Sequence, residues 1–138
     1  MTQRGIIARM AGLTTHVLDT ANGGPAAGVA VRLFELSPER TLVTETVTNA
    51  DGRTDESLLN SAALVTGSYE LEFDVGKYFA AQGSRLAEPP FLDKVVIRCS
   101  LREGEKYHVP LLVSPWSYST YRGCLLYTSD AADDYFWV

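Results

Sequence analysis

Hydrophobic and polar residues alternate along much of this chain with a period of two, which is the spacing of a β-strand with one buried face. The clearest example is residues 69–75, where apolar and acidic side chains alternate as Tyr69, Glu70, Leu71, Glu72, Phe73, Asp74 and Val75. This segment predicts a strand with an apolar face on a core and an acidic face in water. Segments rich in Val, Thr, Tyr, Leu and Ile predict further strands at residues 13–19, 29–36, 42–48, 94–99, 107–113 and 117–122.

Turn-forming residues separate these segments. Gly, Pro, Asn, Asp and Ser gather at residues 22–25, 37–38, 51–52, 83–84 and 103–104. Residues 76–82 predict one short helix, which Gly83 ends. Short strands separated by turns, with no internal repeat, predict an all-β fold in which two sheets form a sandwich of about seven to eight strands.

The two ends of the chain depart from this pattern. Residues 1–12 precede the first predicted strand and are expected to form a flexible N-terminal extension, which leaves residues 13–123 as one domain. Residues 124–138 have no period, an acidic centre and an aromatic end. They resemble translated cloning-adaptor sequence, and a genuine tail that frays is the alternative. We therefore expect residues 124–138 to be disordered or an artefact.

Composition narrows the classes of partner. The net charge of −5 argues against nucleic acid, whose phosphates require Lys and Arg, and against anionic membranes. No apolar run approaches the ~20 residues of a membrane span. The two cysteines, Cys99 and Cys124, lack metal-site spacing and predict reduced thiols in a cytoplasmic protein. A peroxisomal location is the alternative, because residues 9–17 loosely match an N-terminal address.

The chain has two histidines, and each falls inside a predicted strand: His16 and His108. A histidine in a strand is most often structural. The two could form a pair if their strands lie side by side, and imidazoles exchange protons near neutral pH. Two histidines alone make a weak zinc site, because zinc takes three or four protein ligands.

Other candidate residues are an arginine in a turn and a segment dense in hydroxyls. Arg53 follows Asp51-Gly52 and is either solvated or a forked donor for a planar anion. Residues 117–123, which include Ser119 and Tyr121, form either an edge strand or a lining for a polar ligand. No G-x-S-x-G motif indicates a serine nucleophile. Periodicity alone does not show that these side chains converge.

Two segments carry a resemblance to the 5-hydroxyisourate hydrolases. Residues 13–19 (Leu-Thr-Thr-His-Val-Leu-Asp) with residues 24–29 are similar to the opening of that family. Residues 107–115 (Tyr-His-Val-Pro-Leu-Leu-Val-Ser-Pro) with residues 118–123 (Tyr-Ser-Thr-Tyr-Arg-Gly) are similar to its closing signature, which is long and specific. Between them, Arg53 stands where the family keeps an arginine.

The resemblance implies a transthyretin-like (prealbumin-like) sandwich of two four-stranded sheets. It also implies a homotetramer with active sites in a central channel. The implied reaction opens the ring amide of 5-hydroxyisourate, a small molecule on the route from urate to allantoin, and requires no cofactor. The implied catalytic residues are His16, Arg53 and His108, and the implied substrate-binding residues are Tyr121 and Ser119.

The chain departs from the family at two places. Many members carry a further histidine where this chain has Lys106, so a three-histidine zinc site is not expected. Cys124 replaces the usual final serine and fourteen residues follow it, where a tail could block the channel or the tetramer. Two alternatives to the hydrolase stay open: a transthyretin-like carrier of small molecules such as thyroid hormone, and a β-sandwich interaction module. A carrier needs an apolar channel, whereas the candidate residues here are polar.

Overall fold

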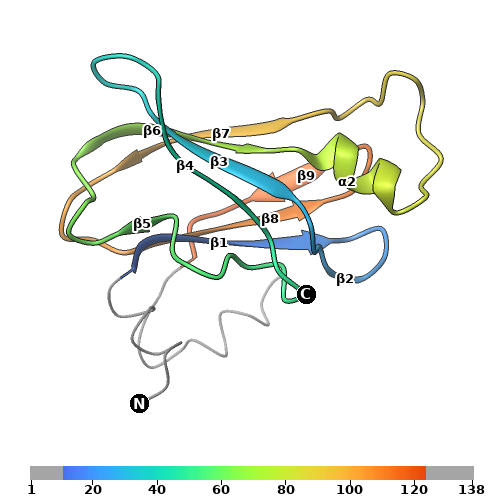
Figure 1. Ribbon diagram of the computed structural model, residues 1–138, viewed down its shortest axis with the longest axis horizontal. Coiled ribbons are helices and arrows are strands. Elements are labelled where there is room, and N and C mark those ends of the chain that lie inside the picture. Colours follow the sequence, from blue (N-terminus) through green and yellow to red (C-terminus); the bar gives the residue numbers. More distant parts are fainter. Residues whose placement is uncertain (1–10, 124–138) are drawn as a thin grey trace.

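Two β-sheets packed face to face make up the part of the chain that the computed structural model describes, residues 11–123 (Figure 1). The first, called here the β1 sheet, has the strand order β2 (Gly24–Pro25), β1 (Ala11–Asp19), β8 (Tyr107–Val113) and β9 (Tyr118–Thr120), with β5 (Leu59–Asn60) also paired to β1. The second, the β6 sheet, has the order β4 (Thr41–Val47), β3 (Ala30–Glu35), β6 (Gly67–Phe73) and β7 (Val95–Leu101). The helix α2 (Val75–Ala81) follows β6 at one end of the sandwich.

The core lies between the sheets, and the apolar residues of each alternating strand point into it. On β1 the inward side chains are Leu13, Thr15 and Val17, and on β6 they include Leu71 and Phe73. Each large apolar side chain buried here contributes roughly 1.5–3 kcal/mol relative to exposure. The alternation in the sequence therefore identifies the inner face of each sheet, and it leaves the even-numbered positions of β1 on the outer face.

The acidic side of β6 does not face water as expected. Glu70 is 9% exposed and Asp74, just after the strand, is 4% exposed. Arg32 on β3 donates to the Asp74 carboxylate at 3.0 and 2.9 Å, and Lys94 donates to it at 3.0 Å. These hydrogen bonds, led by that from Arg32, lower the pKa of Asp74 to about 2. Because Arg32 on β3 and Lys94 just before β7 cover the acidic row, the expectation of a solvated face was wrong.

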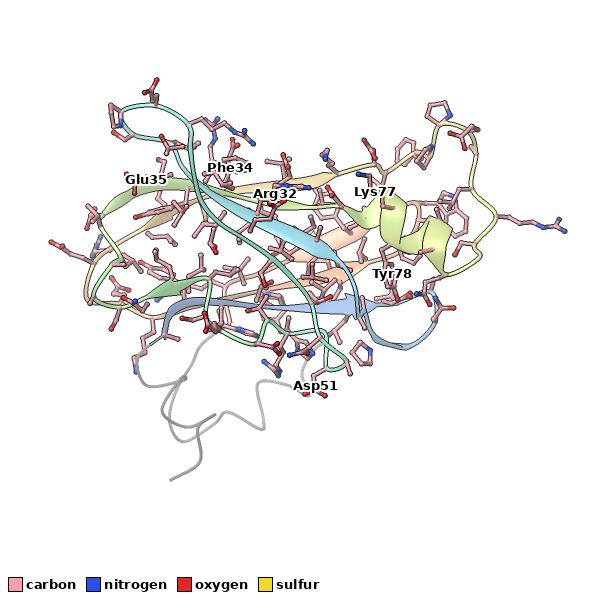
Figure 2. The ribbon with its side chains drawn as sticks, in the orientation of Figure 1. Arg32, Phe34, Glu35, Asp51, Lys77 and Tyr78 are labelled. Atoms are coloured by element: carbon pink, nitrogen blue, oxygen red, sulfur yellow. The ribbon has the colours of Figure 1, made fainter. Side chains whose placement is uncertain are left out.

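The helix is tied to the β1 sheet by a buried hydrogen bond. Tyr78 points from α2 toward β1 (Figure 2), and its hydroxyl donates to Asp19 Oδ2 at 2.7 Å. Burial by itself raises the pKa of the Asp19 carboxyl, but hydrogen bonds from Asn22 and Tyr78 outweigh it and leave that pKa below its ordinary value. A buried carboxylate with this many donors fixes where the end of β1 meets the helix.

The predicted strands and helix are confirmed, with shifts at their ends. The helix begins at Val75, one residue earlier than expected, and β9 covers only Tyr118–Thr120 of the predicted 117–122. The two-residue strands β2 and β5 are too short to show a period. The strand β1 begins at Ala11, inside the expected N-terminal extension, whereas residues 1–10 and 124–138 lie outside the described residues. Within residues 11–123, no helix has the length and apolar composition needed to cross a membrane.

Candidate functional site

His16 lies on the outer face of β1 and is anchored to a turn. Its Nε2 lies 2.9 Å from the backbone oxygen of Asp51. Because a carbonyl oxygen can only accept a hydrogen bond, Nε2 carries the proton in this contact. In the sheet, His16 stands directly opposite Arg53 in an antiparallel bridge, which puts both residues on the same face.

Arg53 is placed by a tight turn that the side chain of Asn49 closes. The Asn49 Oδ1 accepts from the backbone N–H of Asp51 at 2.9 Å and from that of Arg53 at 3.2 Å. The Gly52 carbonyl accepts from Val17 N at 2.7 Å, which joins the turn to β1. Gly52 has a φ of 77°, and a Cβ there would collide with the Val17 carbonyl oxygen. This position therefore requires glycine. The turn places Arg53 opposite His16.

His108 is buried in β8, where it is 7% exposed, and its ring has neighbours on two sides. The strands β1 and β8 are parallel, and their register places His108 opposite Thr14. The Thr14 Oγ1 lies 2.8 Å from His108 Nδ1. On the other side, Gly123 donates its backbone N–H to the His108 carbonyl at 2.7 Å. A Cβ on Gly123 would stand 3.0 Å from His108 Cδ2, so this backbone lies directly against the ring.

The hydroxyl-rich segment lies along the other edge of β8. The β8–β9 register pairs Leu112 with Ser119 and Leu111 with Thr120, and His108 bridges to Gly123. Between these pairs the same register sets Tyr121 opposite Pro110. Ser119 is exposed and Tyr121 is half-buried. Both belong to the alternating set that shares the outer face with His108.

These registers arrange the candidate residues in rows across the outer face of the β1 sheet. One row runs Arg53, His16, Pro110 and Tyr121, and the next runs Thr14, His108 and Gly123. Neighbouring strands lie ~4.8 Å apart within a row, and adjacent rows on one face lie about 7 Å apart along the strands, so these side chains are neighbours. The structure thus brings His16, Arg53, His108 and Tyr121 together, and Ser119 lies one row further along, opposite Leu112.

This group of side chains can bind an anion and move a proton. The guanidinium of Arg53 offers forked donors, and two imidazoles with a phenol lie beside it. Among residues 11–123, no group of three or more His, Cys, Asp or Glu side chains is arranged to hold a metal ion. The outer face suits a polar, planar, negatively charged ligand better than an apolar one.

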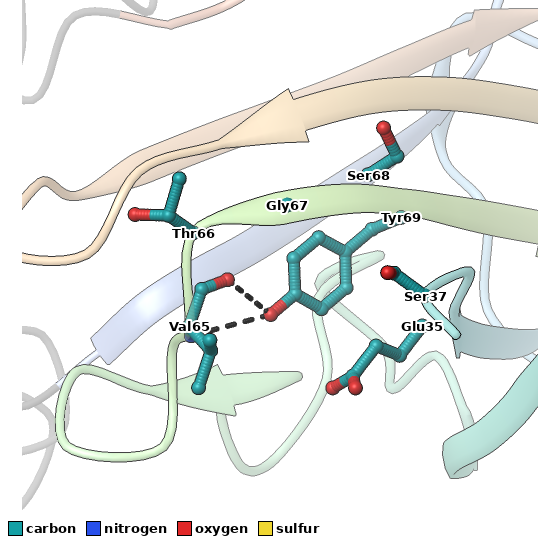
Figure 3. A pocket seen from close by; sticks show the side chains of 7 residues that line it. All are labelled: Glu35, Ser37, Val65, Thr66, Gly67, Ser68 and Tyr69. Carbon is teal, nitrogen blue, oxygen red and sulfur yellow. Dashed lines mark hydrogen bonds between the residues drawn. The ribbon is translucent and has the colours of Figure 1, made fainter. Parts of the chain in front are cut away.

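A separate pocket of about 130 Å³ lies between β6 and the end of β3, away from this site (Figure 3). Its lining residues are Glu35, Ser37, Val65, Thr66, Gly67, Ser68 and Tyr69. The Tyr69 hydroxyl there donates to the Val65 carbonyl at 2.6 Å and accepts from the Val65 N–H at 3.2 Å. Tyr69 therefore closes a loop of the fold, and the pocket contains none of the candidate catalytic residues.

The sequence did not single out Thr14, Asn49 or Gly123 as functional residues. In the sequence Thr14 looks like an ordinary strand residue. Only the parallel pairing of β1 with β8 places it opposite His108. Asn49 precedes the Asp51-Gly52 turn and could have been considered as the side chain that closes it. The residues around Gly123 do not indicate a turn. Its role depends on the His108 side chain, which lies opposite it.

Known proteins of similar sequence cover most of this chain. The HIUase/Transthyretin family matches residues 13–123. The chain is 55% identical over 114 residues to a 5-hydroxyisourate hydrolase from Deinococcus radiodurans, covering 81% of this chain and 95% of that protein. It is 54% identical over 112 residues to a 5-hydroxyisourate hydrolase from Mesorhizobium japonicum, covering 80% of this chain and 90% of that protein.

Solved structures share the same sandwich. An (S)-allantoin synthase matches with a TM-score of 0.79 and 46% identity, over 83% of this chain and 44% of that chain. The present chain therefore spans less than half of that protein. Transthyretin from Sparus aurata matches with a TM-score of 0.73 and 30% identity, over 81% of this chain and 96% of that chain. The predicted transthyretin-like fold is confirmed, and the chain belongs to the HIUase/Transthyretin family.

Proposed function

We propose that this chain is a hydrolase that opens the ring amide of 5-hydroxyisourate to give 2-oxo-4-hydroxy-4-carboxy-5-ureidoimidazoline, in the degradation of urate to allantoin. The observation that carries the proposal is the shared outer face of the β1 sheet. There, His16 bridges to Arg53, and His108 lies one row away on the adjacent strand. The identity of 54–55% to two 5-hydroxyisourate hydrolases supports the same reaction.

The chemistry needs a base, an anion-binding group and a donor for the leaving nitrogen. A histidine, His108 or His16, takes a proton from water as the water oxygen bonds to the ring carbonyl carbon. Arg53 binds the negative charge of the substrate and stabilises the oxyanion that develops. The ring C–N bond then breaks, and the histidine returns its proton to the leaving nitrogen. Tyr121 and Ser119 shape the substrate site, and no cofactor takes part.

A carrier function of the transthyretin kind is the alternative, because fold alone does not determine function. The row of Arg53 and His16, with His108 beside it, argues against it. An apolar aromatic hormone on this face would displace water from the Arg53 guanidinium and the two imidazoles without offering acceptors or donors in its place, at a cost in binding. Tight binding of an iodinated phenol, with no hydrolysis of 5-hydroxyisourate, would favour the carrier.

We further propose that the active unit is a homotetramer that encloses the outer face of the β1 sheet. Two large aromatic side chains near β9 support an interface, because Trp116 is 67% exposed and Tyr118 is 45% exposed. The strand β9 is also the edge of its sheet. An edge strand and exposed aromatic residues are both features that association would cover. A cytoplasmic location, with the peroxisome as the alternative, stays a prediction from the sequence.

Replacing His108 by asparagine tests the proposed function. The asparagine amide can retain a contact with Thr14 but cannot take a proton, so we expect kcat to fall by about 10²- to 10⁴-fold. The rate is followed by the ultraviolet decay of freshly made 5-hydroxyisourate, and sedimentation checks that the assembly is unchanged. Thr15→Val serves as the control, because this substitution removes a buried hydroxyl from the core face of the adjacent strand β1 and does not touch the His108 ring. A His108→Asn variant with near-normal rate would remove His108 from the mechanism.

A further inference from the structure

We propose that Thr14 is a positioning residue for His108, whose hydroxyl holds the imidazole by Nδ1 before and after the ring takes a proton. This inference rests on the proposed hydrolase function and adds a residue to it. The observation behind it is the distance of 2.8 Å between Thr14 Oγ1 and His108 Nδ1. With Nδ1 engaged by Thr14, proton exchange with the attacking water falls to Nε2.

The backbone makes this contact a fixed feature of the fold. The parallel β1–β8 ladder runs continuously from Leu13 opposite Tyr107 to Asp19 opposite Val113, so Thr14 cannot shift against His108 without breaking it. The backbone of Gly123 limits the ring from the other strand, with 3.0 Å between an added Cβ and His108 Cδ2. The ring is therefore held between a hydroxyl on one side and a glycine on the other.

The choice of a hydroxyl fits both protonation states of the ring. When His108 is charged, Nδ1 must donate, so Thr14 Oγ1 must accept. If the neutral ring also carries its proton on Nδ1, the same hydrogen bond persists while Nε2 gains a proton from water and later passes it to the leaving nitrogen. No proton moves at Nδ1 and no side chain has to turn. Such preorganisation lowers the reorganisation needed at the moment of reaction.

The neighbouring threonine provides a matched control within the same strand. Thr15 faces the core, and its hydroxyl donates to the Val109 carbonyl at 2.7 Å. Thr14→Val and Thr15→Val each replace a hydroxyl by a methyl group and cost one hydrogen bond to β8. Only the first removes a contact with the His108 ring. A purely structural role for both hydroxyls would make the two variants behave alike.

Steady-state kinetics on the full chain gives the first test. We expect Thr14→Val to lower kcat by about 10- to 100-fold, as a hydrogen bond to a charged group would, with KM changed by less than about threefold. Thr14→Ser, which keeps the hydroxyl, should recover most of the rate, and Thr15→Val should keep it. Equal rates in Thr14→Val and the parent chain would overturn the proposal. So would equal losses in Thr14→Val and Thr15→Val.

Imidazole ¹⁵N NMR gives a second test that does not depend on catalysis. The chain has only two histidines, so a His16→Gln variant assigns both rings. We expect neutral His108 to be protonated at Nδ1, and to lose this preference in Thr14→Val but not in Thr15→Val. A ring protonated at Nε2, or one unaffected by Thr14→Val, would overturn the proposal. If the parent chain is inactive but the tautomer responds to Thr14, the proposed function fails and the hold of Thr14 on the ring stands.

Discussion

At the scale of single residues, the His108 ring fits its place because Gly123, on the neighbouring segment, has no side chain. Gly123 is buried against His108, and its backbone N–H donates to the His108 carbonyl. A Cβ there would meet both His108 Cδ2 and His108 Cβ, at 3.0 and 3.3 Å. The His108 ring sits on the neighbouring strand and also bonds Thr14, so it has little freedom to give way.

Gly123→Ala should therefore reduce the hydrolysis rate by turning the His108 ring away from Thr14. Losing this one hydrogen bond corresponds to the same fall in kcat that we expect for Thr14→Val, about 10- to 100-fold. The change lies at the edge of the sheet, so we expect the midpoint of thermal unfolding to move by only a few degrees. Ultraviolet assays and thermal melts of the variant measure the two effects. An unchanged kcat would mean that the ring does not depend on this contact.

At the scale of elements, the period-two pattern predicts strands but not their partners. It identified β1, β6 and β8, and it placed His108 on the opposite face from Tyr107 and Val109. It could not reveal that β1 and β8 pair in parallel, since Thr14 and His108 are 94 residues apart in sequence. The acidic face of β6 was misjudged for the same reason, because Arg32 reaches it from β3 and Lys94 reaches it from the residue before β7.

The same ion pairs predict how stability depends on pH. The pKa of Asp74 in the folded chain is about 2, below its ordinary 3.8, chiefly because of its hydrogen bonds to Arg32. The folded state therefore binds the Asp74 proton more weakly than the unfolded state does. The corresponding contribution of about 2 kcal/mol is present above about pH 4 and is lost as the pH falls toward 2.

Asp74→Asn should make the fall in unfolding free energy between about pH 4 and pH 2 shallower by about 2 kcal/mol. Urea unfolding across this range measures the change. Glu45→Gln is the control, because it removes another carboxylate from Arg32 but one that is 54% exposed, and exposed pairs contribute little. If Asp74→Asn keeps the full acid dependence of the parent chain, the carboxylate responsible lies elsewhere.

At the scale of the whole molecule, the candidate residues lie on a sheet face and not in the pocket beside Tyr69. An enclosed site on such a face requires something to cover it, which is the physical reason to expect association. Sedimentation should give a mass of about 60 kDa, four times the 15.1 kDa chain. A chain that stays monomeric at assay concentrations and still hydrolyses the substrate would contradict the proposed channel.

The most direct test of the proposed hydrolase is the ultraviolet decay of freshly generated 5-hydroxyisourate, with and without the purified 138-residue chain. We predict a decay that accelerates in proportion to protein concentration and that falls toward the spontaneous rate for His108→Asn. A spontaneous rate unchanged by the parent chain, in a preparation that sediments as a folded tetramer, would contradict the proposal that this chain is a hydrolase.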